Sequence, residues 1–233
     1  MLKIFYKSIG YLLFLAAEFK HSHIRKATLL VMVLFIFMQL SGLNNVLFYM
    51  EPILKSAGFN LIEPSSMVSY ALACSITAGI LCVRLYDKFG RRLLLIISSF
   101  GVSLALAALA KHFVLKNNEI EWIGSQWLPV VSIVVFIVSF VAGLNSIPSL
   151  VASEVYPANV KPIAMCMASL TAAAAAFVAA RAYQPLVDAY GEAYVFYAHS
   201  AITLMAVPFA VIFLPETKGK TLQQIQDLLI KKS

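Results

Sequence analysis

Two amide side chains, those of Gln39 and Asn44, lie near the end of the first long apolar segment. Each amide both donates and accepts hydrogen bonds, so it could pair with polar groups of neighbouring helices or of a bound solute. Because polar groups are costly against lipid, we expect these side chains to face a protein interior.

The spacing of Gln39 and Asn44 limits how they could act together. Five positions along a regular helix turn the chain by about 500°, or roughly 140° net, so the two amides do not share a narrow stripe. Gly42 lies between them and would let the helix bend so that both line one cavity. The alternative is that both amides only form hydrogen bonds between helices.

The segment 87–92, Asp-Lys-Phe-Gly-Arg-Arg, could form ion pairs at a tight turn. Gly90 permits the turn, and Arg91 and Arg92 can bridge neighbouring helix ends. A simpler interpretation is that any cytoplasmic loop of a membrane protein attracts basic residues. The segment alone favours neither interpretation.

The sequence contains no pattern typical of an enzyme. There is no HExxH, no GxSxG, no phosphate-binding loop and no plausible acid pair. Cys74, Cys82 and Cys166 form no CxxC pair, and we interpret them as packing residues rather than a disulfide or zinc site. His199 lacks an obvious ligand partner, and we expect a hydrogen-bonded packing role for it. We therefore expect no catalysis, no metal and no cofactor.

The elements that must position these residues are long apolar segments. Of the 233 residues, 61% are hydrophobic and 12% are charged, and the mean hydropathy is +0.85. Six segments have the length of about 20 residues that a helix needs to cross a bilayer. They cover residues 27–49, 65–86, 93–114, 128–152, 163–183 and 193–214. Since backbone polar groups in lipid must be paired within their segment, we predict an all-α, polytopic membrane protein with a six-helix bundle.

The net charge of +7 is distributed unevenly along the chain. If both termini are cytoplasmic, 14 of the 18 Lys and Arg residues fall on the inner side and four on the outer side. This asymmetry is the positive-inside pattern of proteins embedded in a lipid bilayer. It explains the basic composition without nucleic acid, so we expect cytoplasmic termini and no nucleic-acid partner.

Two segments contain residues that interrupt helices. Glu51 and Pro52 follow the first segment, and we expect them to stop its helix. Gly143, Asn145 and Pro148 lie inside the fourth segment, where we expect a kink or an unwound turn.

These patterns divide the chain into three regions. Residues 1–26 are expected to form a cytoplasmic or interfacial segment, because their apolar run is too short to span a bilayer. Residues 27–214 form the transmembrane domain. Residues 215–233 form a cytoplasmic tail, in which Thr221 and Gln224 fit a capping box at the start of a short amphipathic helix.

Four motifs follow one another along the chain. They are Gln-Leu-Ser-Gly-Leu-Asn at 39–44, Asp-Lys-Phe-Gly-Arg-Arg at 87–92, Glu-Val-Tyr-Pro-Ala-Asn-Val-Lys at 154–161 and Pro-Glu-Thr-Lys-Gly-Lys-Thr at 215–221. Their order and spacing resemble the second six-helix half of transporters in the sugar-porter branch of the major facilitator superfamily. The resemblance covers about residues 15–230, and insect sugar and trehalose facilitators look like the most similar subgroup.

The resemblance implies a charge cluster that braces the closed cytoplasmic side of the bundle. On this chain the cluster would consist of Asp87, Arg91, Arg92, Glu154, Lys161 and Glu216. Lys161 stands where the family usually has arginine, and an ammonium group cannot make the bidentate contact of a guanidinium. We therefore expect a weaker contact at this position.

The resemblance also implies a sugar site, and there the sequence departs from the family pattern. Gln39 and Asn44 match family amides, and Tyr49 matches an aromatic residue near the outer gate. Other residues stand at positions that are polar or aromatic in the family, namely Met38, Ser75, Val141 and Ser149. Sugar recognition needs several hydrogen-bonding groups and an aromatic platform. The scaffold therefore matches the family more fully than the solute site does.

The function implied by the resemblance is transport of a sugar or related polyhydroxylated solute by alternating access between two six-helix bundles. Because no carboxylate aligns with the site, we expect facilitative uniport, in the plasma membrane, with this chain as the C-terminal half. It would need an N-terminal half or another bundle as partner. Two alternatives stay open: a transport-inactive or regulatory membrane protein on the same scaffold, and a six-helix channel or carrier that works as a homodimer.

Overall fold

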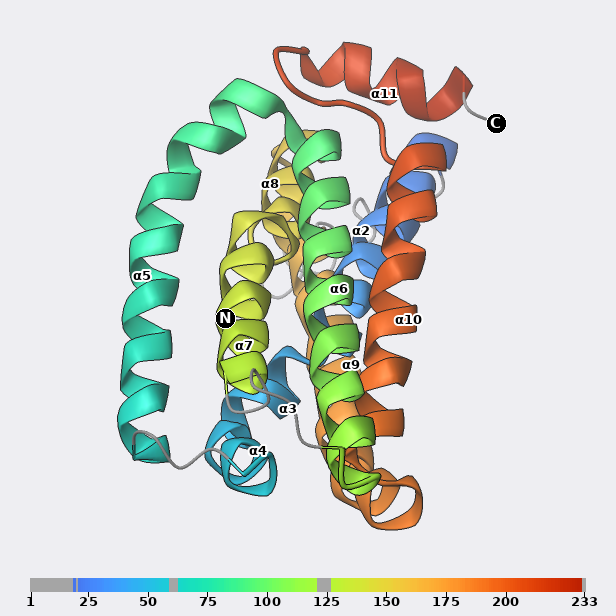
Figure 1. Ribbon diagram of the computed structural model, residues 1–233. Coiled ribbons are helices and arrows are strands. Elements are labelled where there is room, and N and C mark those ends of the chain that lie inside the picture. The colour runs from blue at the N-terminus through green and yellow to red at the C-terminus, as the bar shows by residue number, and fades with distance from the viewer. Residues whose placement is uncertain (1–18, 20, 59–62, 121–126, 232–233) are drawn as a thin grey trace, which may run out of the picture.

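A computed structural model describes residues 19, 21–58, 63–120 and 127–231 (Figure 1). The described chain is helical, with short turns between helices. In order, the helices are α2 (Ser22–Leu40), α3 (Leu43–Phe48), α4 (Met50–Ser56), α5 (Pro64–Phe89), α6 (Arg91–Asn117), α7 (Trp127–Ser139), the π-helix η1 (Phe140–Leu144), α8 (Ile147–Val155), α9 (Lys161–Tyr190), α10 (Glu192–Ile212) and α11 (Leu222–Lys231). The expected interfacial part of residues 1–26 lies mostly outside the described residues.

Six stretches of the described chain are long and apolar enough to cross a membrane. They are Ser22–Phe48, Ser65–Tyr86, Arg91–Asn117, Trp127–Val155, Lys161–Tyr190 and Glu192–Ile212. The predicted all-α fold with six spans is therefore confirmed. The fifth spanning helix, α9, runs beyond its predicted end at residue 183 to Tyr190, and Gly191 caps it with a φ of 84°.

The six spans differ in how much of their surface the bundle covers. Helix α6 packs along α10 and α7 (Figure 1). It contributes buried Val102 and Leu106 to a core that also includes Val31 of α2 and Phe136 of α7. Helix α5 stands at the edge of the bundle. In the most apolar windows of α5 and α9 only 17% and 22% of residues are buried, against 56% in α6. These two helices therefore present apolar faces to lipid or to a partner.

The first span is broken at Gly42 and ends at a second break. Helix α2 ends at Leu40, and Gly42 has a φ of 85°, a left-handed conformation that favours glycine. A second break falls at Tyr49, where α3 ends and α4 begins. The prediction that Glu51 and Pro52 stop the helix is wrong. Pro52 lies in the first turn of α4, where a missing backbone N–H costs no helical hydrogen bond.

The fourth span is kinked as predicted. Its middle is the π-helix η1, in which the Asn145 N–H donates to the Phe140 carbonyl at 3.0 Å, and α8 starts afresh at Ile147. Small residues bring this span close to α6. A Cβ on Gly143 would lie 2.6 Å from the Leu94 carbonyl oxygen. The close contact between α6 and η1 thus requires a residue without a side chain at position 143.

The tail helix α11 lies across one end of the bundle (Figure 1). The predicted capping box is present: the Thr221 N–H donates to Gln224 Oε1 at 3.0 Å, and the Gln224 N–H donates to Thr221 Oγ1 at 3.4 Å. Ile225 is buried against the bundle core. The amphipathic helix is therefore confirmed, while the three-region division of the chain stays a prediction.

Candidate functional site

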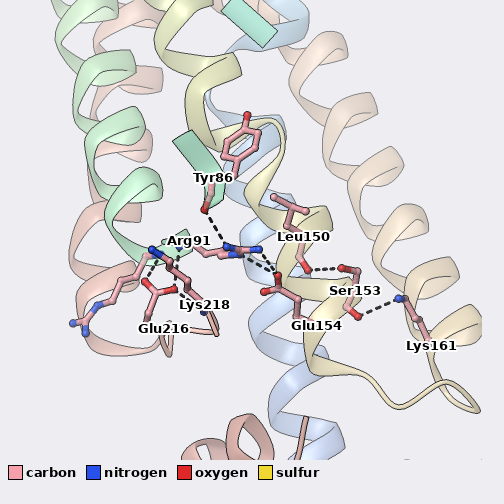
Figure 2. Close-up of polar contacts among 9 residues, drawn as sticks. Tyr86, Arg91, Leu150, Ser153, Glu154, Lys161, Glu216 and Lys218 are labelled. Atoms are coloured by element: carbon pink, nitrogen blue, oxygen red, sulfur yellow. Dashed lines mark hydrogen bonds and ion pairs between the residues drawn. The ribbon is translucent and has the colours of Figure 1, made fainter. Parts of the chain in front are cut away.

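Arg91 and Glu154 form an ion pair between the start of α6 and the end of α8 (Figure 2). Glu154 Oε1 accepts from Arg91 Nη2 at 2.8 Å and from Nε at 3.0 Å, and Arg91 Nη1 donates to the Tyr86 carbonyl at 3.0 Å. The two side chains are only 13% and 23% exposed. Glu154 Oε2 is buried without a hydrogen-bond partner among the described residues. Arg91 therefore supplies the donors and the positive charge that compensate the largely buried Glu154 carboxylate.

Glu216 caps the start of α6, and among the described residues it forms no ion pair with a side-chain cation. Its Oε1 accepts from the backbone N–H groups of Arg91 at 3.1 Å and Lys218 at 3.0 Å, and its Oε2 accepts from that of Arg92 at 3.2 Å. A carboxylate at a helix N-terminus also interacts favourably with the helix dipole. Gly90 permits the close approach, because a Cβ there would lie 2.7 Å from Glu216 Oε2.

Two further expected members of the cluster, Lys161 and Arg92, donate to backbone carbonyls. Lys161 Nζ donates to the Ser153 carbonyl at 3.0 Å, and Arg92 Nη2 donates to the Val211 carbonyl. Asp87 lies in α5, and its side chain is outside the described part of the structure. Sequence reasoning missed Lys218, whose Nζ donates to the Lys88 carbonyl at 2.8 Å. Among the described residues, the cluster is thus one ion pair surrounded by bonds to helix ends.

The break at Gly42 brings the two predicted amides together. Asn44 Nδ2 donates to Gln39 Oε1 at 2.9 Å, although a regular helix would separate them by roughly 140°. Both residues are partly accessible. The contact uses one donor and one acceptor, which leaves the Gln39 amide N–H groups and Asn44 Oδ1 with capacity for a solute.

Tyr49 packs against an aromatic residue that sequence reasoning missed. Its ring lies 4.6 Å from that of Tyr183 on α9, centroid to centroid, at an interplanar angle of 33°. Tyr183 is buried and is followed at 6.5 Å by the ring of Phe196 on α10. The only sequence signal was an aromatic residue after the alanine run of the fifth span. The pair ties the junction of α3 and α4 to α9.

A cavity of about 160 Å³ lies beside α3. It is lined by Leu43, Leu47, Leu72, Ser75, Ile137, Phe140, Val141 and Asn145. Ser75 and Val141, which depart from the family pattern, both belong to this wall. The wall is therefore mostly apolar, and its polar groups are Ser75 and Asn145, the latter at the end of the π-helix.

Comparison with known proteins assigns the family. Residues 10–229 match a family model described as "Sugar (and other) transporter". The chain belongs to this family of sugar porters. The chain is thus a multi-pass membrane protein of a non-enzymatic transporter family.

Relatives with known names support the same assignment. The facilitated trehalose transporter Tret1 of Bombyx mori is 31% identical over 206 residues, which cover 86% of this chain and 39% of the relative. Sugar transporter ERD6-like 7 of Arabidopsis thaliana is 35% identical over 214 residues, which cover 91% of this chain and 44% of the relative. The predicted resemblance is confirmed. The chain spans less than half the length of these relatives.

Solved structures show the same fold at low identity. The proton:xylose symporter XylE bound to 6-bromo-6-deoxy-D-glucose matches with a TM-score of 0.76 at 19% identity, over 97% of this chain and 49% of that chain. The inward-open xylose transporter XylE from E. coli matches with a TM-score of 0.73 at 22% identity, over 87% and 42%. The six spans therefore correspond to about half of such a transporter.

Proposed function

We propose that this sugar porter is the C-terminal half of a facilitator for a sugar or related polyhydroxylated solute. The observation that carries the proposal is the Gln39–Asn44 pair, held at a helix break and partly accessible. Broken helices near the middle of a bundle are the usual place of transporter binding sites, because they expose unused polar groups. The two amides supply hydrogen bonds for hydroxyl groups, and Tyr49, packed on the buried Tyr183, supplies aromatic surface.

Uniport is the proposed mode of transport. Neither Gln39 nor Asn44 is a carboxylate, and the neighbouring cavity beside α3, whose wall does not include them, carries no carboxylate either. Val141 in that wall stands at the position where the family has an acid. A proton-coupled carrier needs a group that takes up and releases protons near its solute. Several relatives are named facilitated trehalose transporters, which agrees with movement down a gradient. No cofactor is involved in this proposal.

The proposed partner is a second six-helix bundle, either an N-terminal half or another copy. Helices α5 and α9 are the least covered spans, and each exposes several large apolar side chains. On α5 these include Leu72, Ile76 and Ile80, and on α9 Leu170, Phe177 and Val178. Two bundles that meet through these faces would enclose the solute between them and rock around it.

A transport-inactive or regulatory membrane protein is the second candidate function. It is favoured by the apolar wall of the cavity, where Ser75 and Val141 replace family polar residues, and by Met38 and Ser149 at two further family positions. Such a protein could keep the scaffold and the ion pair while it lost solute affinity. Solute binding therefore separates the two candidates.

We also propose a plasma-membrane location with both termini cytoplasmic, on the basis of the charge asymmetry. A cysteine or glycosylation tag inserted next to Asn118 should be modified from the outside of intact cells. A tag after Ser233 should react only after the cells are permeabilised. Modification of both tags from the same side would contradict this topology.

Gln39→Ala and Asn44→Ala should each weaken binding of glucose or trehalose, because an amide that binds a solute hydroxyl contributes about 1–3 kcal/mol. Binding is measured by isothermal titration on the purified protein, and thermal stability is measured separately. Asn118→Ala is the matched control, since its amide caps the far end of α6 by donating to the Val114 carbonyl at 2.9 Å. If both site variants lose stability but bind as tightly as the parent, the site assignment is wrong.

A further inference from the structure

His199 on α10 contacts both sides of the break in the first span. Its Nδ1 lies 2.8 Å from the carbonyl oxygen of Leu40, the last residue of α2. Its Nε2 lies 3.0 Å from Nδ2 of Asn45, which belongs to α3 and is only 1% exposed. One imidazole thus bridges the end of one helix and the start of the next. The predicted hydrogen-bonded packing role of His199 is confirmed, and its position between two helix ends indicates a further role.

The two contacts require one tautomer of the ring. A carbonyl oxygen only accepts, so Nδ1 must carry the proton and donate to Leu40. The unprotonated Nε2 then accepts from the Asn45 amide. Because the break leaves the Leu40 carbonyl at a helix end, where no further turn supplies its donor, the ring satisfies a group that would otherwise be unpaired.

The ring also fills the space that Gly42 leaves open. A Cβ on Gly42 would lie 3.2 Å from His199 Cγ, a tight contact, and Gly42 already needs its left-handed φ of 85°. The imidazole therefore packs directly on the turn that separates Gln39 from Asn44.

The helix that carries His199 is firmly attached to the bundle at the next residue. Ser200 Oγ donates to the Ser103 carbonyl on α6 at 2.8 Å and lies 3.0 Å from Ser103 Oγ. Both serines are buried. The imidazole thus belongs to a helix that is packed on and hydrogen-bonded to α6, while it contacts the broken first span.

We infer that His199 is a positioning residue for the solute site. The two residues that it binds, Leu40 and Asn45, directly adjoin Gln39 and Asn44 in the sequence. By fixing both, the ring sets the turn at Gly42 and with it the 2.9 Å contact of the two amides. This inference rests on the proposed function, in which Gln39 and Asn44 bind the solute.

The test uses three substitutions of His199 in the intact protein. His199→Ala removes both contacts, His199→Asn keeps an amide near the position of Nδ1, and His199→Gln keeps one near the position of Nε2. We expect His199→Ala to weaken glucose or trehalose binding roughly 10- to 100-fold, and each amide variant to recover part of that loss. His112→Gln is the control, because His112 is buried and contacts the Ala57 carbonyl, away from the break. It should bind as the parent does.

A second measurement examines the ring without any solute. In the ¹⁵N NMR spectrum of protein labelled at histidine, the pair of ring signals that disappears in His199→Asn belongs to His199. The chemical shifts of this pair should be those of a protonated Nδ1 and an unprotonated Nε2. The Nε2 signal should shift in Asn45→Ala. A ring with a protonated Nε2 and a free Nδ1, or one unaffected by Asn45→Ala, would overturn the inference.

The binding results separate this inference from the proposed function. If Asn44→Ala weakens binding and His199→Ala does not, the solute site stands and the positioning role is wrong. Equal losses of stability in all three His199 variants with unchanged affinity would also overturn it. If the parent protein binds neither sugar, the proposed function fails and the positioning role fails with it, even where the ring contacts are seen.

Discussion

Arg91→Ala is expected to lower the free energy of unfolding by about 3 kcal/mol, because it leaves a mostly buried carboxylate without its partner. Glu154 Oε1 would lose both of its guanidinium donors, and Oε2 already lacks a partner among the described residues. The Tyr86 carbonyl at the end of α5 would lose its donor as well. Denaturant unfolding of the purified protein in detergent micelles measures the change.

An exposed ion pair of the same chain provides the control. Lys55 and Glu51 in α4 are 2.6 Å apart, but their side chains are 63% and 43% exposed. Solvent screens such a pair, so Lys55→Ala should cost less than about 0.5 kcal/mol. The double variant Arg91→Ala/Glu154→Ala should recover part of the loss, because it no longer buries an unpaired charge. A cost for Arg91→Ala no larger than that for Lys55→Ala would contradict the role assigned to the pair.

The same pair should affect conformation more than solute choice. An ion pair that forms in one state and breaks in another shifts the equilibrium between them by its differential energy, about 1–3 kcal/mol. In a complete transporter, Arg91→Ala or Glu154→Ala should therefore change the transport rate and leave the order of preferred solutes unchanged. An altered preference at an unaltered rate would contradict this expectation.

Gly143→Ala is expected to destabilise the protein by about 3 kcal/mol, the upper part of the range for an overpacked core. Its Cβ would lie 2.3 Å from Ser98 Oγ and 2.6 Å from the Leu94 carbonyl oxygen. The serine hydroxyl can rotate away, but the backbone carbonyl cannot, so α6 and η1 must separate. The same unfolding titration measures the loss.

Gly79→Ala is the matched control for this substitution. Gly79 also lies inside a spanning helix, α5, but a Cβ there would be 3.6 Å from Val141 Cγ1, an ordinary contact. The alanine should be neutral or stabilising by up to about 1 kcal/mol, since it has the higher helix propensity. Equal effects of the two substitutions would show that close approach at Gly143 is not needed.

Much of the fold could be predicted from the sequence because its signals are local. The length of each apolar run indicates a span, and Thr221 with Gln224 indicates a cap, since these features depend on neighbouring residues alone. The kink in the fourth span followed from Gly143 and Pro148 for the same reason. The proline at position 52 was misread because its effect depends on whether the helix has already ended before it.

The site was harder to predict because its contacts join distant segments or involve the backbone. Glu216 could be recognised as important by its motif, but nothing in the sequence shows that its partners are N–H groups 124 and 125 positions away. Likewise, the sequence shows His199 only as an isolated polar residue. Its contacts with Leu40 and Asn45 exist because the first span breaks at Gly42. Partners of this kind follow from helix packing, which residue spacing does not reveal.

Uptake of labelled glucose and trehalose into vesicles tests most directly whether this chain forms half of a solute pathway. The chain is reconstituted alone, as the possible homodimer requires, and together with an N-terminal six-helix half of a relative. We predict saturable uptake in at least one arrangement, equal with and without a proton gradient, and lowered at least tenfold in the Gln39→Ala/Asn44→Ala double variant. Uptake no greater than that of empty vesicles in both arrangements, or uptake unchanged in the double variant, would contradict the proposal.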